Sequence, residues 1–348
     1  MTSHEINSNL NFIDDVDFHE IRTWLANNCL ITINQNYFLN LEPSFNIATI
    51  NESLNFTEEI LFSFSRKDNI PISKIPNIFD WFPNIKIKNY QLNSNNFKDL
   101  YKVLILSSQI KKTFNKNKFP LWYDKSKKLF NSQEAQSKIE HVFDTNFEFN
   151  NNASPILNKL SKNYLTTELK IRKKIKAIFI KAQNEGWING DQVVFRNGRS
   201  VLPIKNSFKR KINGITQGQS ATNQTIFIEP MEIIELNNQL TEIEFGIYQE
   251  KQQILKKLTS YFKPLKDKIL ESFNILIKLD QHYTIAQLSY KLNAVYPKIE
   301  PKSTIKIINA INPIFSLSNQ KAIPLNLELK NNKILLLSGP NAGGKTVV

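Results

Sequence analysis

The sequence predicts a mainly α protein: a helical core, two long antiparallel helices around a small β-rich insert, and then the start of an α/β nucleotide-binding domain. Three observations predict this architecture. The first 185 of the 348 residues contain no glycine, and apolar residues recur there at helical spacing. Five of the nine glycines then fall between Gly186 and Gly218, among short β-type runs. Three more lie within a phosphate-binding pattern at residues 339–346.

Residues 1–153 are predicted to form the helical core domain. Phe18, Ile21 and Leu25 mark the apolar face of a first helix, because residues three and four apart share a face. Three prolines within residues 70–84 predict a loop. Two further helices are marked by Ile50, Leu54 and Leu61, and by Phe97, Tyr101, Leu104 and Phe114.

Residues 154–300 are predicted to hold two long helices that form an antiparallel arm. The first begins near Ser154, with Pro155 at a position that helices accept, and the second follows Pro230. We expect Ile243 and Ile247 of the second helix to pack against Ile171, Ile175 and Ile178 of the first. The alternative is that both are ordinary core helices of a bundle. The first helix also has a basic face, made of Lys159, Lys162, Lys170, Arg172, Lys173, Lys174, Lys176 and Lys181.

The insert between these helices, residues 187–229, is predicted to be a small β-rich head. Asn197-Gly198 is typical of a two-residue hairpin turn, because both residues tolerate positive φ. A basic loop follows the second strand, and its residues are candidates for contacts with nucleic-acid phosphates. The expected strands are 192–195, 200–204 and 225–228, and the basic residues are Lys205, Lys209, Arg210 and Lys211.

Residues 301–348 are predicted to begin an α/β domain that binds ATP and Mg²⁺. Runs at 305–307, 325–329 and 334–338 indicate strands, and the last of them leads into G-x-x-x-x-G-K-T. Glycines allow backbone N–H groups to point at phosphate oxygens. Lys345 is expected to reach the β- and γ-phosphates, and the Thr346 hydroxyl to ligate Mg²⁺. The phosphate-binding residues are Gly339, Pro340, Asn341, Ala342, Gly343, Gly344, Lys345 and Thr346.

Charge and cysteine content favour a cytoplasmic protein with a polyanionic partner. The net charge is +14, although residues 1–60 hold nine acidic residues and one basic residue. A basic body of this kind is typical of nucleic-acid binding, and equally of a chain encoded by an AT-rich genome, which is rich in Asn, Lys and Ile. The single cysteine, Cys29, excludes an internal disulfide framework and is expected to be a small buried hydrophobe. No run is long and apolar enough for a membrane helix, and no signal peptide is evident.

In this order, these parts resemble the MutS family, and within it the MutS2 branch. The loop at residues 339–347 is similar to that family's G-P-N-x-G-G-K-T-V. The stretch 196–205, R-N-G-R-S-V-L-P-I-K, resembles the branch's R-D-G-R-Y-V-I-P-V-K. Residues 214–240 are similar to its G-I-V…Q-S-A…T-L-F-I-E-P…E-L-N-N-x-L run.

The resemblance implies that the long helices are levers, that the head is a clamp closing on nucleic acid, and that the ATPase domain forms a homodimer. It implies branched DNA in recombination suppression, or ribosomal RNA of stalled ribosomes, as the partner; the sequence favours neither. In the family, a Walker B acid and a signature loop complete the ATPase, and this branch adds a C-terminal Smr nuclease domain. We expect a chain that stops at Val348 not to hydrolyse ATP alone, whether that end is natural or not.

One departure, one recurring triplet and one alternative accompany this interpretation. The family's early His-Pro pair is Asn312-Pro313 here, which affects local nucleotide contacts. Phe-x-Glu triplets, which read mismatches in the repair branch, occur at residues 18–20, 56–58 and 227–229, in predicted helices and in the exit from the head, and none of them is expected to read a mismatch. The alternative function is a non-enzymatic helical scaffold with a vestigial phosphate loop.

Overall fold

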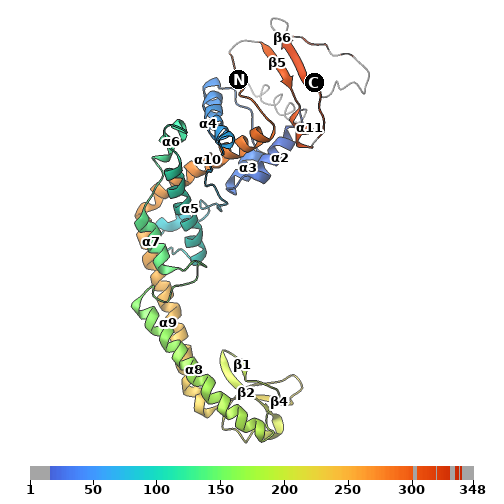
Figure 1. Cartoon of the computed structure of the whole chain (residues 1–348). Coiled ribbons are helices and arrows are strands. Elements are labelled where there is room, and N and C mark those ends of the chain that lie inside the picture. The colour runs from blue at the N-terminus through green and yellow to red at the C-terminus, as the bar shows by residue number, and fades with distance from the viewer. Residues whose placement is uncertain (1–15, 301–303, 319, 330–333, 337, 339–348) are drawn as a thin grey trace. The chain divides into compact units, whose positions relative to one another are not determined.

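The computed structural model describes residues 16–300, 304–318, 320–329, 334–336 and 338. These residues form a mainly α structure, as the sequence predicts (Figure 1). In the part described, no helix combines the length and the apolar content needed to cross a membrane. The chain divides into two compact units, one of Met1–Asn84, Lys98–Gln133 and Pro264–Val348, the other of Ile85–Phe97 and Glu134–Lys263.

The first unit is built around helix α10. It packs against helices from the start of the chain, and its residues Phe273, Leu276 and Leu279 are fully buried. The predicted helices near residues 18 and 50 are confirmed as α2 and α4, whereas α10 was not predicted. The helices of this unit are α2 (Phe18–Asn28), α3 (Ile33–Leu39), α4 (Ile47–Ser65), most of α5 (Ser94–Thr113), α6 (Pro120–Ser126) and α10 (Lys266–Lys291).

A buried carboxylate joins α10 to the start of α3. The Asp280 side chain accepts hydrogen bonds from the backbone N–H groups of Leu30 and Ile31, both at 2.9 Å, and from the Asn34 amide at 2.7 Å. Two of these donors lie in the segment just before α3, and the third is a side chain of its first turn. Burial of the Asp280 carboxyl raises its pKa. Burial of the Cys29 thiol, and secondly the nearby Asp280 charge, raise the pKa of Cys29 to about 11. Cys29 is buried, as expected, and its thiol is inert at neutral pH.

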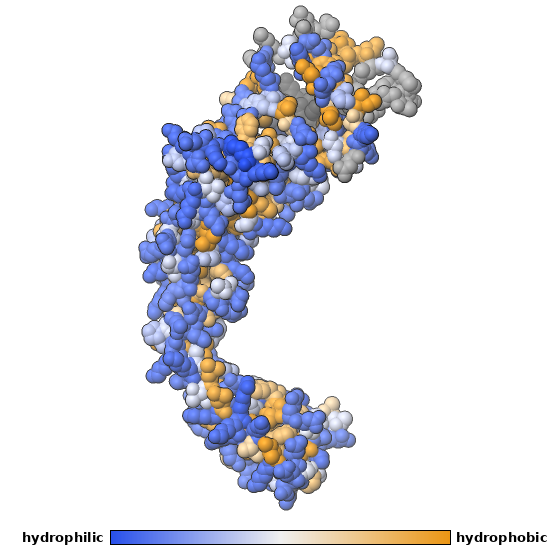
Figure 2. Space-filling model, viewed as in Figure 1, coloured by the Kyte–Doolittle hydropathy of each residue, from blue (hydrophilic) through white to orange (hydrophobic). Residues whose placement is uncertain are grey.

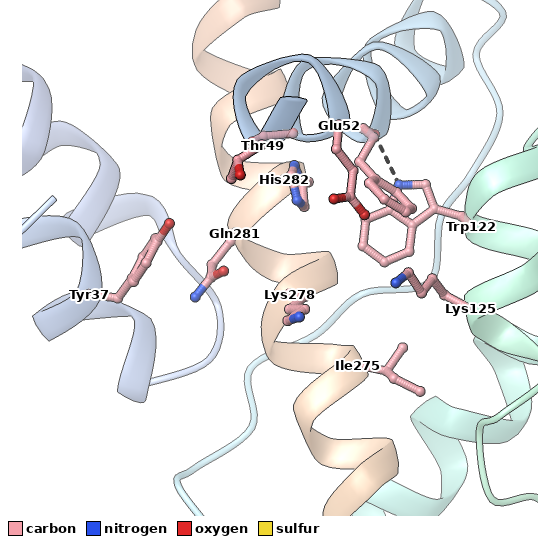
Figure 3. Close-up of a pocket in the computed structure, with 11 residues that line it drawn as sticks. Tyr37, Thr49, Glu52, Trp122, Lys125, Ile275, Lys278, Gln281 and His282 are labelled. Carbon is pink, nitrogen blue, oxygen red and sulfur yellow. Dashed lines mark hydrogen bonds between the residues drawn. The ribbon is translucent and has the colours of Figure 1, made fainter. Parts of the chain in front are cut away.

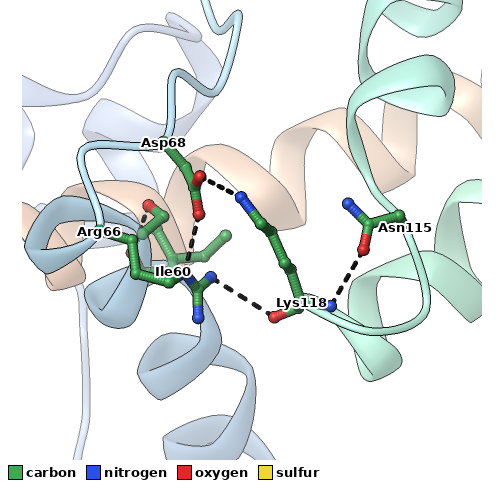
Figure 4. Close-up of polar contacts among 6 residues, drawn as sticks. Ile60, Arg66, Asp68, Asn115 and Lys118 are labelled. Atoms are coloured by element: carbon green, nitrogen blue, oxygen red, sulfur yellow. Dashed lines mark hydrogen bonds and ion pairs between the residues drawn. The ribbon is translucent and has the colours of Figure 1, made fainter.

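A polar cluster connects the end of α4 to the segment that precedes α6 (Figure 4). The Asp68 carboxylate accepts from Lys118 Nζ at 2.6 Å and from Arg66 Nε at 2.8 Å. Both cations lower the pKa of Asp68, mainly through these hydrogen bonds. The cluster is exposed, so water screens it and its contribution is to hold loop geometry rather than to add much stability.

The second unit contains α7 (Gln133–Val142), the head and the two long helices of the arm, α8 (Pro155–Asn184) and α9 (Met231–Phe262). The predicted start of α8 is confirmed, since the Ser154 hydroxyl accepts from the Leu157 N–H. The arm is antiparallel. Ser154, before the start of α8, donates to Glu250 near the end of α9 at 2.7 Å, and Lys174 near the end of α8 reaches the Glu232 carbonyl.

The register of the arm differs from the prediction. Ile171 and Ile175 are buried in a cluster with Ile233 and Leu240, not with residues 243 and 247. Ile247 instead lies in a shallow groove with Tyr164 and other residues near the start of α8. The difference arises because periodicity defines the apolar face of each helix but not their axial offset.

The head is a four-stranded antiparallel sheet with strand order β1-β2-β4-β3. The predicted hairpin is confirmed: Arg196 pairs with Arg199, and Asn197 and Gly198 have φ values of 50° and 74°. The first strand is shorter than expected. The strands are β1 (Val194–Arg196), β2 (Arg199–Lys205), β3 (Gly214–Gln219) and β4 (Thr225–Pro230).

Two further strands pair antiparallel in the first unit, β5 (Ile305–Ala310) and β6 (Leu325–Leu329). Both were predicted. Between them lies α11 (Pro313–Leu317), whose first turn is capped by the Asn312 side chain accepting from the Ile314 N–H at 2.9 Å. Residues 334–336 have no regular structure, unlike the strand expected there.

Candidate nucleic-acid interface and nucleotide site

The head is held together by one fully buried carboxylate, that of Glu229 on β4. It accepts two hydrogen bonds from Arg199 Nη1, at 2.8 and 3.1 Å, from the first residue of β2. The Gln217 amide of β3 donates to it at 2.6 Å, and the Asn237 amide of α9 at 2.8 Å. Three strands and the arm therefore meet on a single side chain, whose charge is balanced by a guanidinium and two amides.

The same network places Arg199 between the head and α9. Its second terminal nitrogen donates to the Asn238 side chain at 2.6 Å. Gly214 lies so close to this point that a Cβ there would stand 2.1 Å from the Glu229 carbonyl oxygen, which explains the glycine. The residues that carry the family resemblance in the head therefore include the ones that stiffen it. Sequence patterns marked them as a motif but did not show that they form one hydrogen-bond network.

The predicted basic residues lie at one end of the head, in two different settings. Lys205 ends β2, and its ammonium donates to the Gly186 carbonyl at 2.9 Å. Lys209, Arg210 and Lys211 follow a short 3₁₀ turn, η2 (Asn206–Phe208), and are exposed. Among the described residues, none of these three side chains has an ion-pair partner. Three adjacent, exposed cations on one turn are suited to contact phosphate oxygens.

The predicted basic face of α8 is exposed along the arm. All eight of its lysine and arginine residues face solvent, and Figure 2 shows hydrophilic side chains over most of the visible surface of α8 and α9. The only acidic residue of α8, Glu168, pairs with Arg172 at 2.7 Å. The helix therefore contributes a row of positive charge that leads toward the head within the same unit.

The phosphate loop, residues 339–346, lies outside the described residues, and so do Lys345 and Thr346. Its assignment remains a prediction from the sequence. Among the residues that are described, no group of three or more histidine, cysteine, aspartate or glutamate side chains is placed to hold a metal ion.

Two of the three Phe-x-Glu triplets, those on α4 and β4, have buried rings. In the triplet on β4, Phe227 is 8% exposed and Glu229 is the buried centre of the head network. Phe56 on α4 is likewise buried, against Trp122. A residue that reads a mismatch must reach the base stack, and these rings are enclosed by protein.

Comparison with curated proteins gives matches over nearly the whole chain. A protein named Endonuclease MutS2 from Caldicellulosiruptor saccharolyticus is 29% identical over 334 residues, which is 95% of this chain. Proteins of the same name from Geobacillus sp. and Staphylococcus aureus are 28% and 25% identical over 338 and 343 residues. The chain is a relative of the MutS2 proteins. The predicted branch is thereby confirmed, although no family model matches the chain.

The chain spans 42–43% of the length of these MutS2 relatives. Their name describes an endonuclease of the MutS2 class, and that activity is a property of those longer proteins. The part that matches includes the arm, the head and the strands β5 and β6, so the alignment covers the elements on which the predicted clamp and nucleotide site depend.

Proposed function

We propose that this chain is the nucleic-acid-clamping part of an ATP-regulated, MutS2-like protein. The observation that carries the proposal is the basic turn of the head: Lys209, Arg210 and Lys211 are exposed, adjacent and without ion-pair partners in the described part of the chain. The turn follows β2, which the Glu229 network ties to the arm.

The proposed contacts are to the nucleic-acid backbone, so they carry no sequence preference. Branched DNA and the ribosomal RNA of stalled ribosomes both present such a backbone. The name of the MutS2 relatives supports DNA as the first partner to test. In the proposal, ATP and Mg²⁺ bind at residues 339–346 of a homodimer and control the clamp.

The test is a binding measurement by fluorescence anisotropy over a range of salt concentrations. Lys209→Glu with Arg210→Glu is expected to weaken binding to all sequences about equally. The double substitution is also expected to reduce the magnitude of the slope of log affinity against log salt concentration, by about 0.9 for each duplex phosphate that the variant no longer neutralises. The control is Lys256→Glu with Lys257→Glu, the same charge change at two exposed lysines of α9.

Equal reductions of affinity in the two double variants would mean that only net charge matters, and the clamp assignment would fail. No binding by the parent to either branched DNA or ribosomal RNA would favour the alternative, a helical scaffold. Comparing branched DNA, linear duplex and ribosomal RNA in the same assay identifies the preferred partner.

A further inference from the structure

A pocket in the first unit is lined by residues of four helices (Figure 3). Its volume is about 280 Å³, which is near the lower end for small-molecule sites. Residues far apart in the sequence converge on it, from α3, α4, α6 and α10. Those that carry the argument are Glu52, Phe56, Trp122, Lys125, Lys278 and His282.

The wall of the pocket is preformed. The rings of Phe56 and Trp122 pack edge to face with centroids 5.0 Å apart, and both residues are buried. Trp122 Nε1 donates to the Phe56 carbonyl at 3.0 Å. The His282 ring lies 5.7 Å from Phe56 and 5.6 Å from Trp122. A ligand therefore meets side chains already fixed by their own contacts, which reduces the entropy cost of binding.

His282 presents a hydrogen-bond acceptor there. The Thr57 hydroxyl lies 3.0 Å from the Ser53 carbonyl, to which it can donate, and 2.9 Å from His282 Nδ1, where the tautomer of the ring decides which atom donates. In the tautomer that carries its hydrogen on Nδ1, Nε2 has a free lone pair. Burial first, and the nearby Lys278 charge second, lower the pKa of His282 to about 4. The ring is therefore neutral at pH 7.

Two cations line the same pocket. Within the described residues, neither Lys125 nor Lys278 has a carboxylate at ion-pair distance. The Lys125 ammonium lies 5.4 Å from the centre of the Phe56 ring. Glu52 is the one carboxylate among the lining residues. Two ammonium groups attract an anion, whereas the histidine acceptor and the carboxylate suit hydroxyl or amino donors on the same ligand.

We propose that this pocket binds a small phosphorylated metabolite that carries hydrogen-bond donors, of the class of a nucleoside monophosphate. The phosphate is held by Lys125 and Lys278, and a hydroxyl or amino group of the ligand donates to His282 Nε2. The small volume and the Glu52 carboxylate disfavour a strand of repeated phosphates. This site is independent of the clamp proposal, since it shares no residue with the head or the phosphate loop.

The test is calorimetric titration of the full chain with AMP, GMP, CMP and UMP, carried out with Lys345→Ala so that the phosphate loop contributes nothing. At least one monophosphate is expected to bind. Lys278→Gln, at an exposed position, is expected to weaken that binding about tenfold or more, as removal of one charge-assisted hydrogen bond should. His282→Phe keeps the ring packing, removes the acceptor and is expected to weaken it as well.

Lys291→Gln, an exposed change on the same helix but outside the pocket, is the control and should leave affinity unchanged. Inorganic phosphate and the unphosphorylated nucleosides are expected to bind more weakly than the nucleotide. The proposal is overturned if no monophosphate binds, if binding survives Lys278→Gln, or if phosphate alone binds as tightly as the nucleotides. Because Lys278→Gln lies on the surface, the test does not depend on whether His282→Phe folds.

Discussion

At the scale of single residues, Glu229 and Arg199 decide how rigid the head is. Arg199→Ala leaves the fully buried Glu229 carboxylate with two amide donors and no cation. Removing one partner of a buried pair costs roughly 3–5 kcal/mol, and the exposure of Arg199 places this pair at the lower end of that range. We expect faster hydrogen exchange in β2 and β4 and a lower melting temperature.

Arg196→Ala is the matched control for that change. Arg196 lies three residues earlier, is exposed, and places its guanidinium 4.3 Å from the centre of the Phe227 ring. An exposed cation–π contact contributes only about 0.5–1 kcal/mol. Equal destabilisation by the two substitutions would show that the carboxylate network does not hold the head.

His282 makes the stability of the first unit depend on pH. Its pKa is about 4 in the folded chain and about 6.5 when unfolded, so below pH 6.5 the unfolded state binds a proton that the folded state does not. The free energy of unfolding therefore falls as the pH drops from about 6.5 to about 4, by about 3 kcal/mol in total from this group.

Urea unfolding of the parent and of His282→Phe at pH 7 and pH 4.5 measures this contribution. The variant should lose less stability on acidification than the parent does. Burial raises the pKa values of Glu59 and Asp280, which act in the opposite direction, and the comparison between variants cancels them. Parallel decreases in both proteins would contradict the buried, neutral state of the ring.

At the scale of elements, the arm depends on residues near the head. Ile171 is 2% exposed and belongs to the cluster that joins α8, α9 and the sheet, whereas Ile247 is only partly buried. Ile171→Ala should cost about 2–5 kcal/mol, as large-to-small changes in a core do. Ile247→Ala should cost less than half as much, in urea unfolding monitored by circular dichroism. A reversed order would favour the pairing of Ile243 and Ile247 with Ile171, Ile175 and Ile178 that the sequence predicted.

The two helices of the arm differ in charge. α8 carries eight basic residues and one acidic residue, whereas α9 carries five acidic and three basic residues. Tyr164 of α8 shows the contact between them: burial raises its pKa first, and the neighbouring Glu244 of α9 raises it further. The excess positive charge of α8 is thus only partly offset by its partner helix, and it is available to a polyanion.

At the scale of the whole molecule, the residues proposed for the clamp and those proposed for the nucleotide site fall in different units of the chain. In a protein extended to the length of the MutS2 relatives, Lys345→Ala should abolish ATP turnover if residues 339–346 are the nucleotide site, since a phosphate loop uses its lysine to contact the β- and γ-phosphates. Thr346→Ala should be nearly as severe, because it removes a ligand of Mg²⁺. Phosphate release measures both.

The control in that protein is the charge reversal at Lys209 and Arg210. It should weaken nucleic-acid binding and leave basal ATP turnover unchanged, because it alters no residue of the loop. Turnover that persists after Lys345→Ala would mean that residues 339–346 are not the ATPase site.

The sequence by itself determined which segments are helices and strands wherever the pattern is local. Helical spacing of apolar residues predicted α2, α4 and α8, Asn197-Gly198 predicted the hairpin, and the resemblance to MutS2 came from short contiguous motifs. These features depend on neighbours a few residues away, which a sequence displays directly.

Only the tertiary structure decided the axial register of the arm, the burial of Glu229, and the pocket around His282. Each depends on partners distant in the chain: Thr57 and His282 are 225 residues apart, and the donors to Asp280 are about 250 residues away. Local periodicity is unchanged when one helix slides along another, so it cannot specify which residues meet. Packing and the need to satisfy buried polar groups select among those alternatives.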